Sequence, residues 1–407
     1  MLHNFKLILK KNKLIFNINA YFKSIIFDKK LEKLKYFYLN KKNNISNYHY
    51  NDEEVKLLIK KNLNKRILKL DNSNINFPNI LYAGTNKFQD EIIIQGLNEI
   101  GSVEIITRDN GEYGLHSKPI RSNNFLYDKE TIDKNSKILL ENIELKNNIH
   151  IIIGQFWANY LPMETLEKIT SLGIILVNIS MDDILPEHWG YYKNIRLGSI
   201  GLSSEVDFTL STSKEICEWY FIEGNPAIYW PLASDPKIFI DNTDIYKEKE
   251  IDVIFVGRRY GIREEIVNFL IKNGIKVEAY GNGWKNGSIS PEVTAKLFKK
   301  SKIILGVGTA GYSKKNLTLK LRDFDAPMSG SLYITHSSEN LKNLYDENNE
   351  IVLFKDKFEC LDKIKYYLDN PDKREIIANN GQIKAKNSHT WENRFKDMIN
   401  IIKESIN

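Results

Sequence analysis

The chain has 407 residues, of which 42% are hydrophobic and 27% charged, as expected of a globular protein long enough for two domains. The two cysteines, Cys217 and Cys360, lie far apart. The sequence therefore predicts no disulfide framework or cysteine metal site and favours a reducing cytoplasm. It contains no run of about 18 apolar residues, so we expect no membrane-spanning helix.

The net charge of +6 is unevenly distributed along the chain. Residues 1–70 hold 17 Lys or Arg and 5 Asp or Glu, which leaves the rest of the chain with a net charge of about −6. A basic segment that contains Phe and Ile suits an anionic membrane surface or nucleic acid, and the alternative is a solvated leader with no partner. The acidic remainder argues against nucleic acid as the main partner.

Residues 1–75 show no alternating pattern, and we expect short helices and loops there. From Asn79 onward, apolar strands alternate with helices that end in glycine. The predicted strands of this first region are residues 79–85, 102–107, 150–156, 174–180 and 207–212. The predicted helices between and after them are residues 86–101, 161–173 and 214–224.

After an irregular link at 225–239, the same rhythm restarts. Strands are predicted at 250–258, 275–284, 302–308, 331–335 and 350–354, and helices at 263–274, 290–301, 358–370 and 371–388. Ser290 followed by Pro291 is a typical helix N-terminus.

This alternation predicts an α/β protein with two tandem doubly wound, Rossmann-like domains and a cleft between them. We place a basic N-terminal extension at 1–75 and an N-terminal domain at 76–228. A C-terminal domain follows at 229–385, and 386–407 form a helix that packs back across the domains. Ligands in such folds bind at the carboxyl ends of the parallel strands.

Two glycine turns are predicted at strand ends in the second domain. In "VIFVGRRYGIR", Gly257 ends the first strand and precedes Arg258 and Arg263, whose guanidinium groups fit phosphate oxygens. In "AYGNGW", Gly281 and Gly283 allow a ligand to approach the backbone, and Trp284 offers a flat face for a base or sugar. The alternatives are an ordinary strand-to-helix turn with surface arginines, and a turn with a tryptophan packed beneath it.

The stretch "LRDFDAPMSGSLYIT" carries a third candidate cluster. Asp325, near the start of a short helix, is placed to accept hydrogen bonds from both hydroxyls of a ribose. Arg322, one turn earlier, is placed to reach a phosphate or to pair with Asp325, and Gly330 ends the helix. The alternative is that the two acids, Asp323 and Asp325, only favour the helix N-terminus.

These motifs, taken in order, resemble the group 1 glycosyltransferases and, within them, the CgeB-like, spore-maturation-type branch. The resemblance is carried by "WPLASDPKIF", "DVIFVGRRYGIREEIVNFL", "VEAYGNGW", "LRDFDAPMSGSLYIT" and "NSHTWENRF". It covers about residues 225–400, is weaker over 76–224, where only strand order and "VNISMDD" contribute, and does not extend to 1–75.

The resemblance implies a GT-B fold, with the acceptor on the N-terminal domain and a UDP-, GDP- or dTDP-sugar donor on the C-terminal one. It implies transfer, of hexosyl type, with no bound cofactor and no obligate metal. It places Asp325 on the ribose, Gly257, Arg258 and Arg263 near the diphosphate, and Gly281 to Trp284 in the base or sugar pocket.

The sequence departs from the family pattern at three places. The family acid is usually glutamate, where this chain has Asp325. A second glutamate is common eight positions earlier, where this chain has Leu317, so the usual sugar contact is missing. An asparagine is also expected after the strand in "ILGVG".

A catalytic base for the acceptor hydroxyl is predicted in the first domain. Asp182 and Asp183 directly follow the strand at 174–180, and His188 lies nearby. The alternative is that the acids cap a helix and that the histidine packs beside a tryptophan. His389 belongs to the terminal "HTW" motif and is expected to dock the last helix.

The sequence thus predicts a cytoplasmic glycosyltransferase that acts on a polysaccharide, glycolipid or glycoprotein, held at the inner face of the membrane by residues 1–70. The enzyme alternative is a nucleotide-sugar 2-epimerase of the same fold, although few carboxylates and histidines are available for elimination. The non-enzyme alternative is a catalytically silent spore-coat or scaffold protein that retains the donor site.

Overall fold

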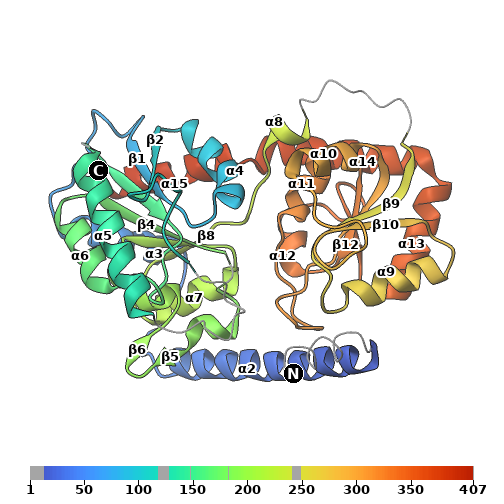
Figure 1. The fold of residues 1–407 in the computed structure, drawn as a ribbon, viewed down its shortest axis with the longest axis horizontal. Coiled ribbons are helices and arrows are strands. Elements are labelled where there is room, and N and C mark those ends of the chain that lie inside the picture. The colour runs from blue at the N-terminus through green and yellow to red at the C-terminus, as the bar shows by residue number, and fades with distance from the viewer. Residues whose placement is uncertain (1–12, 118–127, 147, 182, 241–248, 407) are drawn as a thin grey trace. The chain divides into compact units, whose positions relative to one another are not determined.

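The computed structural model describes residues 13–117, 128–146, 148–181, 183–240 and 249–406. The chain divides into two compact units. Unit 1 takes the chain up to Lys35 together with Ala233–His389, and unit 2 takes Tyr36–Leu232 together with the chain from Thr390 onward. Each unit is an α/β layer structure around its own parallel sheet (Figure 1).

Unit 2 is built on a six-stranded parallel sheet in the order β2-β1-β3-β4-β7-β8. Its strands are β1 (Asn79–Ala83), β2 (Ser102–Ile105), β3 (Ile151–Gly154), β4 (Ile175–Ser180), β7 (Phe208–Ser211) and β8 (Ala227–Tyr229). The central strands β3, β4 and β7 are buried along their whole length, which explains why they read as continuous apolar runs.

Helices cover the sheet of unit 2. They are α3 (Asp52–Leu63), α4 (Lys87–Asn98), α5 (Lys129–Leu145), α6 (Met163–Ser171), α7 (Lys214–Ile222) and α15 (Trp391–Ile406). The short helices η1 (Pro186–Trp189) and η2 (Ser199–Leu202) flank a small antiparallel pair, β5 (Tyr191–Tyr192) and β6 (Ile195–Arg196). The last helix, α15, packs on α3 and α4.

Unit 1 is built on a five-stranded parallel sheet in the order β10-β9-β11-β12-β13. Its strands are β9 (Ile251–Val256), β10 (Val277–Tyr280), β11 (Ser301–Leu305), β12 (Leu332–His336) and β13 (Val352–Phe354). In β9 and β11 the residues Val253 and Ile303 pair within the core of this unit.

The helices of unit 1 are α8 (Pro236–Phe239), α9 (Arg263–Lys272), α10 (Pro291–Lys299), α11 (Arg322–Met328), α12 (Glu339–Lys342), α13 (Lys357–Asp369) and α14 (Pro371–Ser388). The predicted start of α10 is confirmed, because Ser290 accepts a hydrogen bond from the Val293 amide and Pro291 is the first helical residue.

The expectation of only short helices and loops over 1–75 was wrong. Helix α2 (Lys13–Asn43) is 31 residues long, and its residues divide between unit 1 and unit 2 at Lys35. The sequence hid this helix because two of its buried positions are the polar residues Ser24 and Asp28, which blur the apolar period. Among the described residues, no helix is both long and apolar enough to cross a membrane.

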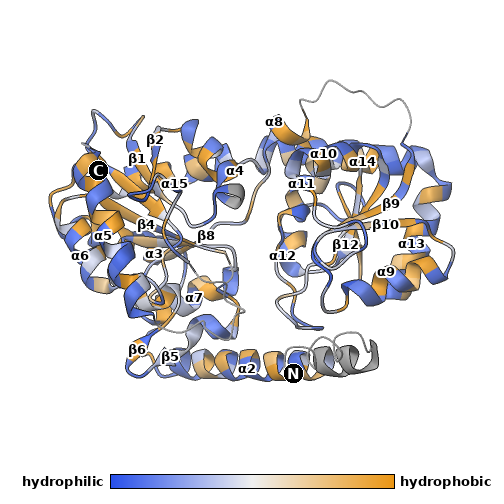
Figure 2. Cartoon of the chain, in the orientation of Figure 1, coloured by the Kyte–Doolittle hydropathy of each residue, from blue (hydrophilic) through white to orange (hydrophobic). Residues whose placement is uncertain are grey.

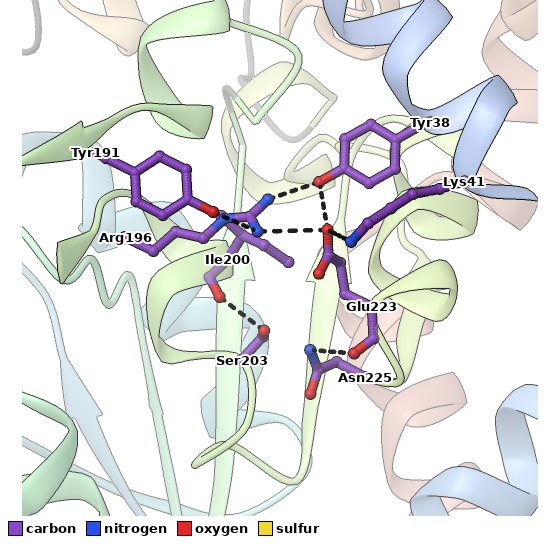
Figure 3. Close-up of polar contacts among 8 residues, drawn as sticks. All are labelled: Tyr38, Lys41, Tyr191, Arg196, Ile200, Ser203, Glu223 and Asn225. Carbon is purple, nitrogen blue, oxygen red and sulfur yellow. Dashed lines mark hydrogen bonds and ion pairs between the residues drawn. The ribbon is translucent and has the colours of Figure 1, made fainter. Parts of the chain in front are cut away.

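In unit 2, the second half of α2 is anchored by Tyr38, which is 1% exposed. Its ring stacks on Trp219 with the ring centroids 4.6 Å apart and meets the edge of Trp189 at 5.2 Å. Its hydroxyl donates to the carboxylate of Glu223 at 2.9 Å and accepts from Arg196 at 2.6 Å (Figure 3). The carboxylate of Glu223 thus collects donors from α2 and from β6, which makes α2 part of the core of unit 2.

Several basic residues of the predicted arm are paired with acids of unit 2. Lys41 reaches Glu223 at 2.9 Å, and Lys42 reaches Glu218 at 2.9 Å. Arg66 pairs with the buried Asp207 at 2.6 Å. Part of the positive charge of residues 36–70 is therefore balanced within the fold.

In unit 1, the first half of α2 packs on the loop that joins β11 to α11. The buried carboxylate of Asp28 accepts hydrogen bonds from the Ser313 hydroxyl at 2.5 Å and from the Asn316 side chain at 3.0 Å. The Lys23 ammonium lies 5.1 Å from the centroid of the Tyr312 ring. This contact fixes the loop that leads into α11.

We predict that Tyr38→Ala lowers the free energy of unfolding by about 3–5 kcal/mol, because it removes a buried aromatic ring and leaves Glu223 and Arg196 short of a partner. Tyr36→Ala is the matched control, since Tyr36 is 66% exposed, and a change within about 0.5 kcal/mol is expected. Urea unfolding followed by tryptophan fluorescence measures both. Equal losses would contradict the anchoring role of Tyr38.

Candidate functional site

Two glycine turns meet at the carboxyl ends of β9 and β10 in unit 1. Gly257 follows β9, and Gly281 follows β10 with a φ angle of 122°. A Cβ atom added to Gly281 would lie 2.4 Å from the carbonyl oxygen of Gly257. Both the backbone conformation and the close approach therefore require glycine at position 281.

Some backbone amides of these turns are used in hydrogen bonds that hold the turns together. The N–H groups of Gly257, Arg259 and Gly281 donate to carbonyls of the same two turns at 2.6–2.9 Å. The arginine side chains at this edge are further donors for an anion.

Two buried arginines converge on one carbonyl at this edge of the sheet. Arg263, which is 4% exposed, donates from Nε to the carbonyl of Val307 at 3.1 Å and from Nη1 to the carbonyl of Arg258 at 3.0 Å. Arg322, which is 7% exposed, donates to the same Val307 carbonyl at 3.3 Å and also to the carbonyl of Val256. Their guanidinium groups therefore fix the ends of β9 and β11.

The ring of Phe255 lies under both guanidinium groups. The Arg322 guanidinium carbon is 4.7 Å from the ring centroid, and that of Arg263 is 5.9 Å from it. The Nε of Arg322 is buried, and it has no hydrogen-bond partner among the described residues. Positive charge is thus concentrated in a partly desolvated place, where an anion would be attracted strongly.

Arg258 and Arg259 have different environments. Both are exposed. Arg259 pairs with Glu264 at 2.5 Å, donates to the Gly283 carbonyl at 3.1 Å and lies over the Trp284 ring. Within the described parts of the chain, the Arg258 guanidinium makes neither an ion pair nor a hydrogen bond. Arg258 is therefore the more available of the two for a ligand.

Trp284 is half-buried and supports the Gly257 turn. Its indole N–H donates to the Gly257 carbonyl at 2.8 Å, and its ring meets that of Phe255 at 5.7 Å. This is the arrangement of a tryptophan packed beneath a turn. Its proposed contact with a base or sugar stays a prediction.

Asp325 lies in the first turns of α11, at the same edge of the sheet as the arginines. Burial raises the pKa of its carboxyl group to about 7; Asp235 and Asp323 act in the same direction, while Ser234 and Arg322 oppose them. Between pH 3.8 and about pH 7, the Asp325 carboxyl group is therefore mostly protonated in the folded protein and mostly ionised in the unfolded chain. The contribution of Asp325 to the free energy of unfolding accordingly decreases as pH rises from about 4 to about 7.

The structure does not bring Gly330 to this edge. Gly330 follows α11 and precedes β12, so it lies at the amino ends of the parallel strands. Its carbonyl accepts a hydrogen bond from Lys249 at 3.0 Å, just before β9, and a Cβ atom there would meet the Gln382 side chain at 2.8 Å. With φ at 76°, Gly330 ends the helix as predicted, but its position does not support nucleotide binding.

Two of the three predicted catalytic residues of the first domain, Asp183 and His188, lie in the interior of unit 2. Asp183 and His188 are each 1% exposed. Asp183 accepts a hydrogen bond from the Ser211 hydroxyl at 2.7 Å, and the His188 ring meets Trp157 at 5.0 Å. Asp182 lies outside the described residues. Burial of this kind is an obstacle to proton transfer from an acceptor, and the catalytic roles stay predictions.

Sequence reasoning missed a second buried carboxylate at the carboxyl edge of unit 2. Asp90, in α4, is 1% exposed and accepts hydrogen bonds from the amides of Thr85 and Asn86 at 3.0 Å. The hydroxyls of Tyr82 and Tyr113 also donate to it, at 3.2 and 3.0 Å. Burial raises its pKa. The sequence does contain a signal for this residue. Asp90 lies near the start of the helix that follows the first predicted strand and its glycine.

Comparisons with known proteins agree with this architecture. Residues 258–400 match the sequence model of a family described as "Glycosyl transferase-like". The match includes the arginines after β9, the β10 turn and α11. Most of the matched residues belong to unit 1, and the last of them, from Thr390 onward, belong to unit 2. No curated protein sequence matches the chain.

Three solved structures show the fold class. Sucrose-phosphate synthase from Thermosynechococcus elongatus is 13% identical with a TM-score of 0.58, over 81% of this chain and 98% of that chain. Anabaena HepE in complex with UDP and glucose is 12% identical with a TM-score of 0.57, over 80% and 100%. An α-glucosyltransferase in complex with UDP-glucose and DNA containing an abasic site is 12% identical with a TM-score of 0.57, over 80% and 99%. The predicted fold, two Rossmann-like domains of the GT-B class, is confirmed.

We predict that Gly281→Ala destabilises the protein by about 1–3 kcal/mol more than Gly287→Ala does, because only the first forces a methyl group into the Gly257 carbonyl. Gly287 is the matched control: it also has positive φ, at 70°, but a Cβ atom there meets nothing within 4 Å. Thermal unfolding of both variants makes the comparison. Equal destabilisation would mean that the two turns are not in close contact.

Proposed function

We propose that the protein transfers a sugar, of hexosyl type, from a nucleoside-diphospho-sugar to a polysaccharide, glycolipid or glycoprotein acceptor. In this proposal unit 1 holds the donor and unit 2 the acceptor, as in the CgeB-like branch that the sequence resembles. UDP-, GDP- and dTDP-sugars are the donor candidates.

The observation that carries the proposal is the pair of buried guanidinium groups at the carboxyl edge of unit 1. Arg263 and Arg322 share the Val307 carbonyl, and Arg322 keeps an unpartnered Nε there. Asp325 follows on α11, and the exposed Arg258 is available nearby. An anion with a hydroxylated ring, such as a nucleoside diphosphate, matches this combination of cations and a carboxylate.

In the proposed reaction, the bond between the sugar C1 and the diphosphate oxygen breaks while an acceptor hydroxyl oxygen forms a bond to C1. The diphosphate leaves with the bonding electrons, and the acceptor proton goes to solvent or to a base. Arg258, Arg263 and Arg322 stabilise the charge on the leaving diphosphate, which is where transfer of this kind needs electrostatic help. Among the described residues, no group of three or more His, Cys, Asp or Glu side chains is placed to hold a metal ion.

The first experiment is thermal unfolding of the protein with UDP, GDP, dTDP and CMP. A ligand that binds only the folded state raises the melting temperature, and one nucleoside diphosphate is expected to do so in wild type but not in Arg258→Ala. Incubation with the corresponding nucleotide sugar should then release that diphosphate when an acceptor is present. Binding without turnover would favour a silent scaffold, release of a free epimerised sugar nucleotide would favour an epimerase, and no binding would contradict the donor site.

Asp325 gives the proposal a pH signature. If its carboxylate accepts the ribose hydroxyls, a pKa of about 7 means that affinity for the nucleotide sugar increases roughly tenfold between pH 6 and pH 8. A nucleotide sugar is the right probe because its esterified diphosphate does not titrate in this range. Isothermal titration calorimetry makes the measurement.

Two variants complete that test. Asp325→Asn should bind more weakly and lose the pH dependence, while Asp372→Asn, which changes an exposed acid in the first turn of α14, should behave as wild type. A pH profile unchanged in Asp325→Asn would exclude this carboxylate from the binding site.

We further propose that α2 holds the protein against an anionic membrane surface, which would make it a peripheral protein at the inner face of the membrane. Hydrophobic and hydrophilic residues alternate along the coloured part of α2 (Figure 2). Phe22, Ile26 and Phe37 are exposed on it, interleaved with the exposed lysines Lys29 and Lys30. Aromatic and aliphatic side chains among lysines are typical of helices that lie on anionic lipids.

The membrane proposal is tested with the double variant Ile26→Ser/Phe37→Ser, which changes exposed positions and leaves Tyr38 in place. Wild type should sediment with vesicles that contain phosphatidylglycerol, and the variant should lose most of this binding. Leu57→Ser, at an exposed position of α3, is the control. Equal binding of all three proteins would remove α2 as the membrane contact.

A further inference from the structure

The chain between β11 and α11 folds back on itself in unit 1, and we call residues 308–318 the hairpin. Backbone hydrogen bonds join its two arms. The Ala310 amide donates to the Asn316 carbonyl at 2.9 Å, and the Thr318 amide donates to the Gly308 carbonyl at 2.8 Å. The hairpin therefore has a base, next to β11, and a tip between the two arms.

Helix α2 holds the tip of the hairpin through one carboxylate oxygen. The Oδ1 atom of Asp28 accepts hydrogen bonds from the Ser313 hydroxyl at 2.5 Å and from the Asn316 side chain at 3.0 Å. The Ser313 oxygen in turn accepts from the backbone amides of Lys315 and Asn316, at 3.1 and 2.7 Å. Asp28 is 8% exposed and Ser313 is 0% exposed, so the network is buried. The conformation of the tip thus depends on an acceptor that α2 supplies.

The base of the hairpin adjoins the arginines of the proposed donor site. Val307 directly precedes the hairpin, and its carbonyl accepts hydrogen bonds from both Arg263 and Arg322. The tip also contacts this region through two rings. Tyr312 meets Tyr260 with ring centroids 6.3 Å apart, and the Arg263 guanidinium carbon lies 4.2 Å from the centroid of the Tyr260 ring. A change at the tip can therefore reach the arginines by two routes.

We propose that the first half of α2 supports the donor site, and that Asp28 is a positioning residue that sets the affinity for a nucleoside diphosphate without touching it. The inference rests on the proposed function, because it concerns the same donor site. Residues 1–75 carry none of the motifs from which that site was predicted, so the support comes from outside them.

The physical basis is the population of the ordered hairpin. With Asp28 in place, the buried donors of Ser313 and Asn316 have an acceptor, and the hairpin keeps the arrangement that ends at Val307. Without that acceptor, two buried donors lose their partner, and opening of the hairpin becomes less costly. The apparent affinity of a ligand decreases in proportion to the fraction of molecules that are competent to bind it.

The experiment is calorimetric titration of the full chain with UDP, GDP and dTDP, in wild type and in two variants of Asp28. One nucleoside diphosphate should bind wild type, and Asp28→Ala should bind it about tenfold more weakly or worse. Asp28→Asn should recover most of the affinity, because its amide oxygen can replace Oδ1 as the acceptor of both hydrogen bonds. Glu32→Ala, which removes an exposed acid one turn further along α2, is the control and should bind as wild type does.

Two further readouts separate positioning from a purely structural role. Ser313→Ala removes the same contact from the hairpin side, so the double variant Asp28→Ala/Ser313→Ala should lose little more affinity than either single variant. Because coupling is reciprocal, the bound nucleotide should slow hydrogen exchange of the Lys315 and Asn316 amides in wild type, and do so less in Asp28→Ala. A purely structural role would lower the melting temperature of Asp28→Ala and leave its affinity unchanged.

The outcomes distinguish this inference from the function on which it rests. If no nucleoside diphosphate binds wild type, the donor site is wrong and the role of Asp28 is overturned with it. If one binds wild type and Asp28→Ala equally tightly, the donor site stands and only the role of Asp28 is overturned. Equal losses in Asp28→Ala and Glu32→Ala, or additive losses in the double variant, would also overturn it.

Discussion

The carboxyl edge of unit 1 depends on one carbonyl oxygen, that of Val307, which accepts hydrogen bonds from two buried guanidinium groups. A guanidinium ion is stable in a protein interior only where its N–H groups find acceptors, and here the ends of β9 and β11 provide them. The same bonds tie α9 and α11, which carry Arg263 and Arg322, to the sheet. Charge and architecture are therefore coupled: the groups that would attract an anion also determine where the strands end.

Helix α2 changes the interpretation of the basic N-terminal region. Its lysines were expected to act as a free arm, but Tyr38 is buried among tryptophans and Lys41 is paired with Glu223. At its midpoint, Asp28 holds the loop before α11. A helix with buried contacts in both units belongs to the fold, and only its outer face remains for a partner.

The sequence predicted what depends on local pattern. Apolar runs ending in glycine located the strands, and Ser290 with Pro291 located a helix start, because these signals come from backbone chemistry that tertiary contacts rarely override. The glycine turns at 257 and 281 were located by the same signal. The structure shows that the two turns approach each other closely there, because a Cβ atom on Gly281 would meet the Gly257 carbonyl, whereas the sequence argument concerned the approach of a ligand, which stays a prediction.

What the sequence could not give was the direction of side chains at the edges of the sheets. Arg322 was expected to reach a phosphate or Asp325, yet it donates to two backbone carbonyls. Asp183 follows a strand as a cleft-facing acid should, but the chain folds back and buries it beside Ser211. Asp90 drew no attention, since one acid in a helical segment has no distinctive spacing. Such outcomes depend on contacts between distant segments.

The order of the chain through the two units affects how the protein can form. Unit 2 contains residues 36–232, but it also needs the residues from Thr390 onward, where Trp391 and Phe395 pack against Trp230. During synthesis, the sheet of unit 2 is complete long before the helix that covers Trp230 has been made. The unit whose sheet is translated first is thus the last to be finished, and until then it presents an uncovered tryptophan to chaperones and to neighbouring chains.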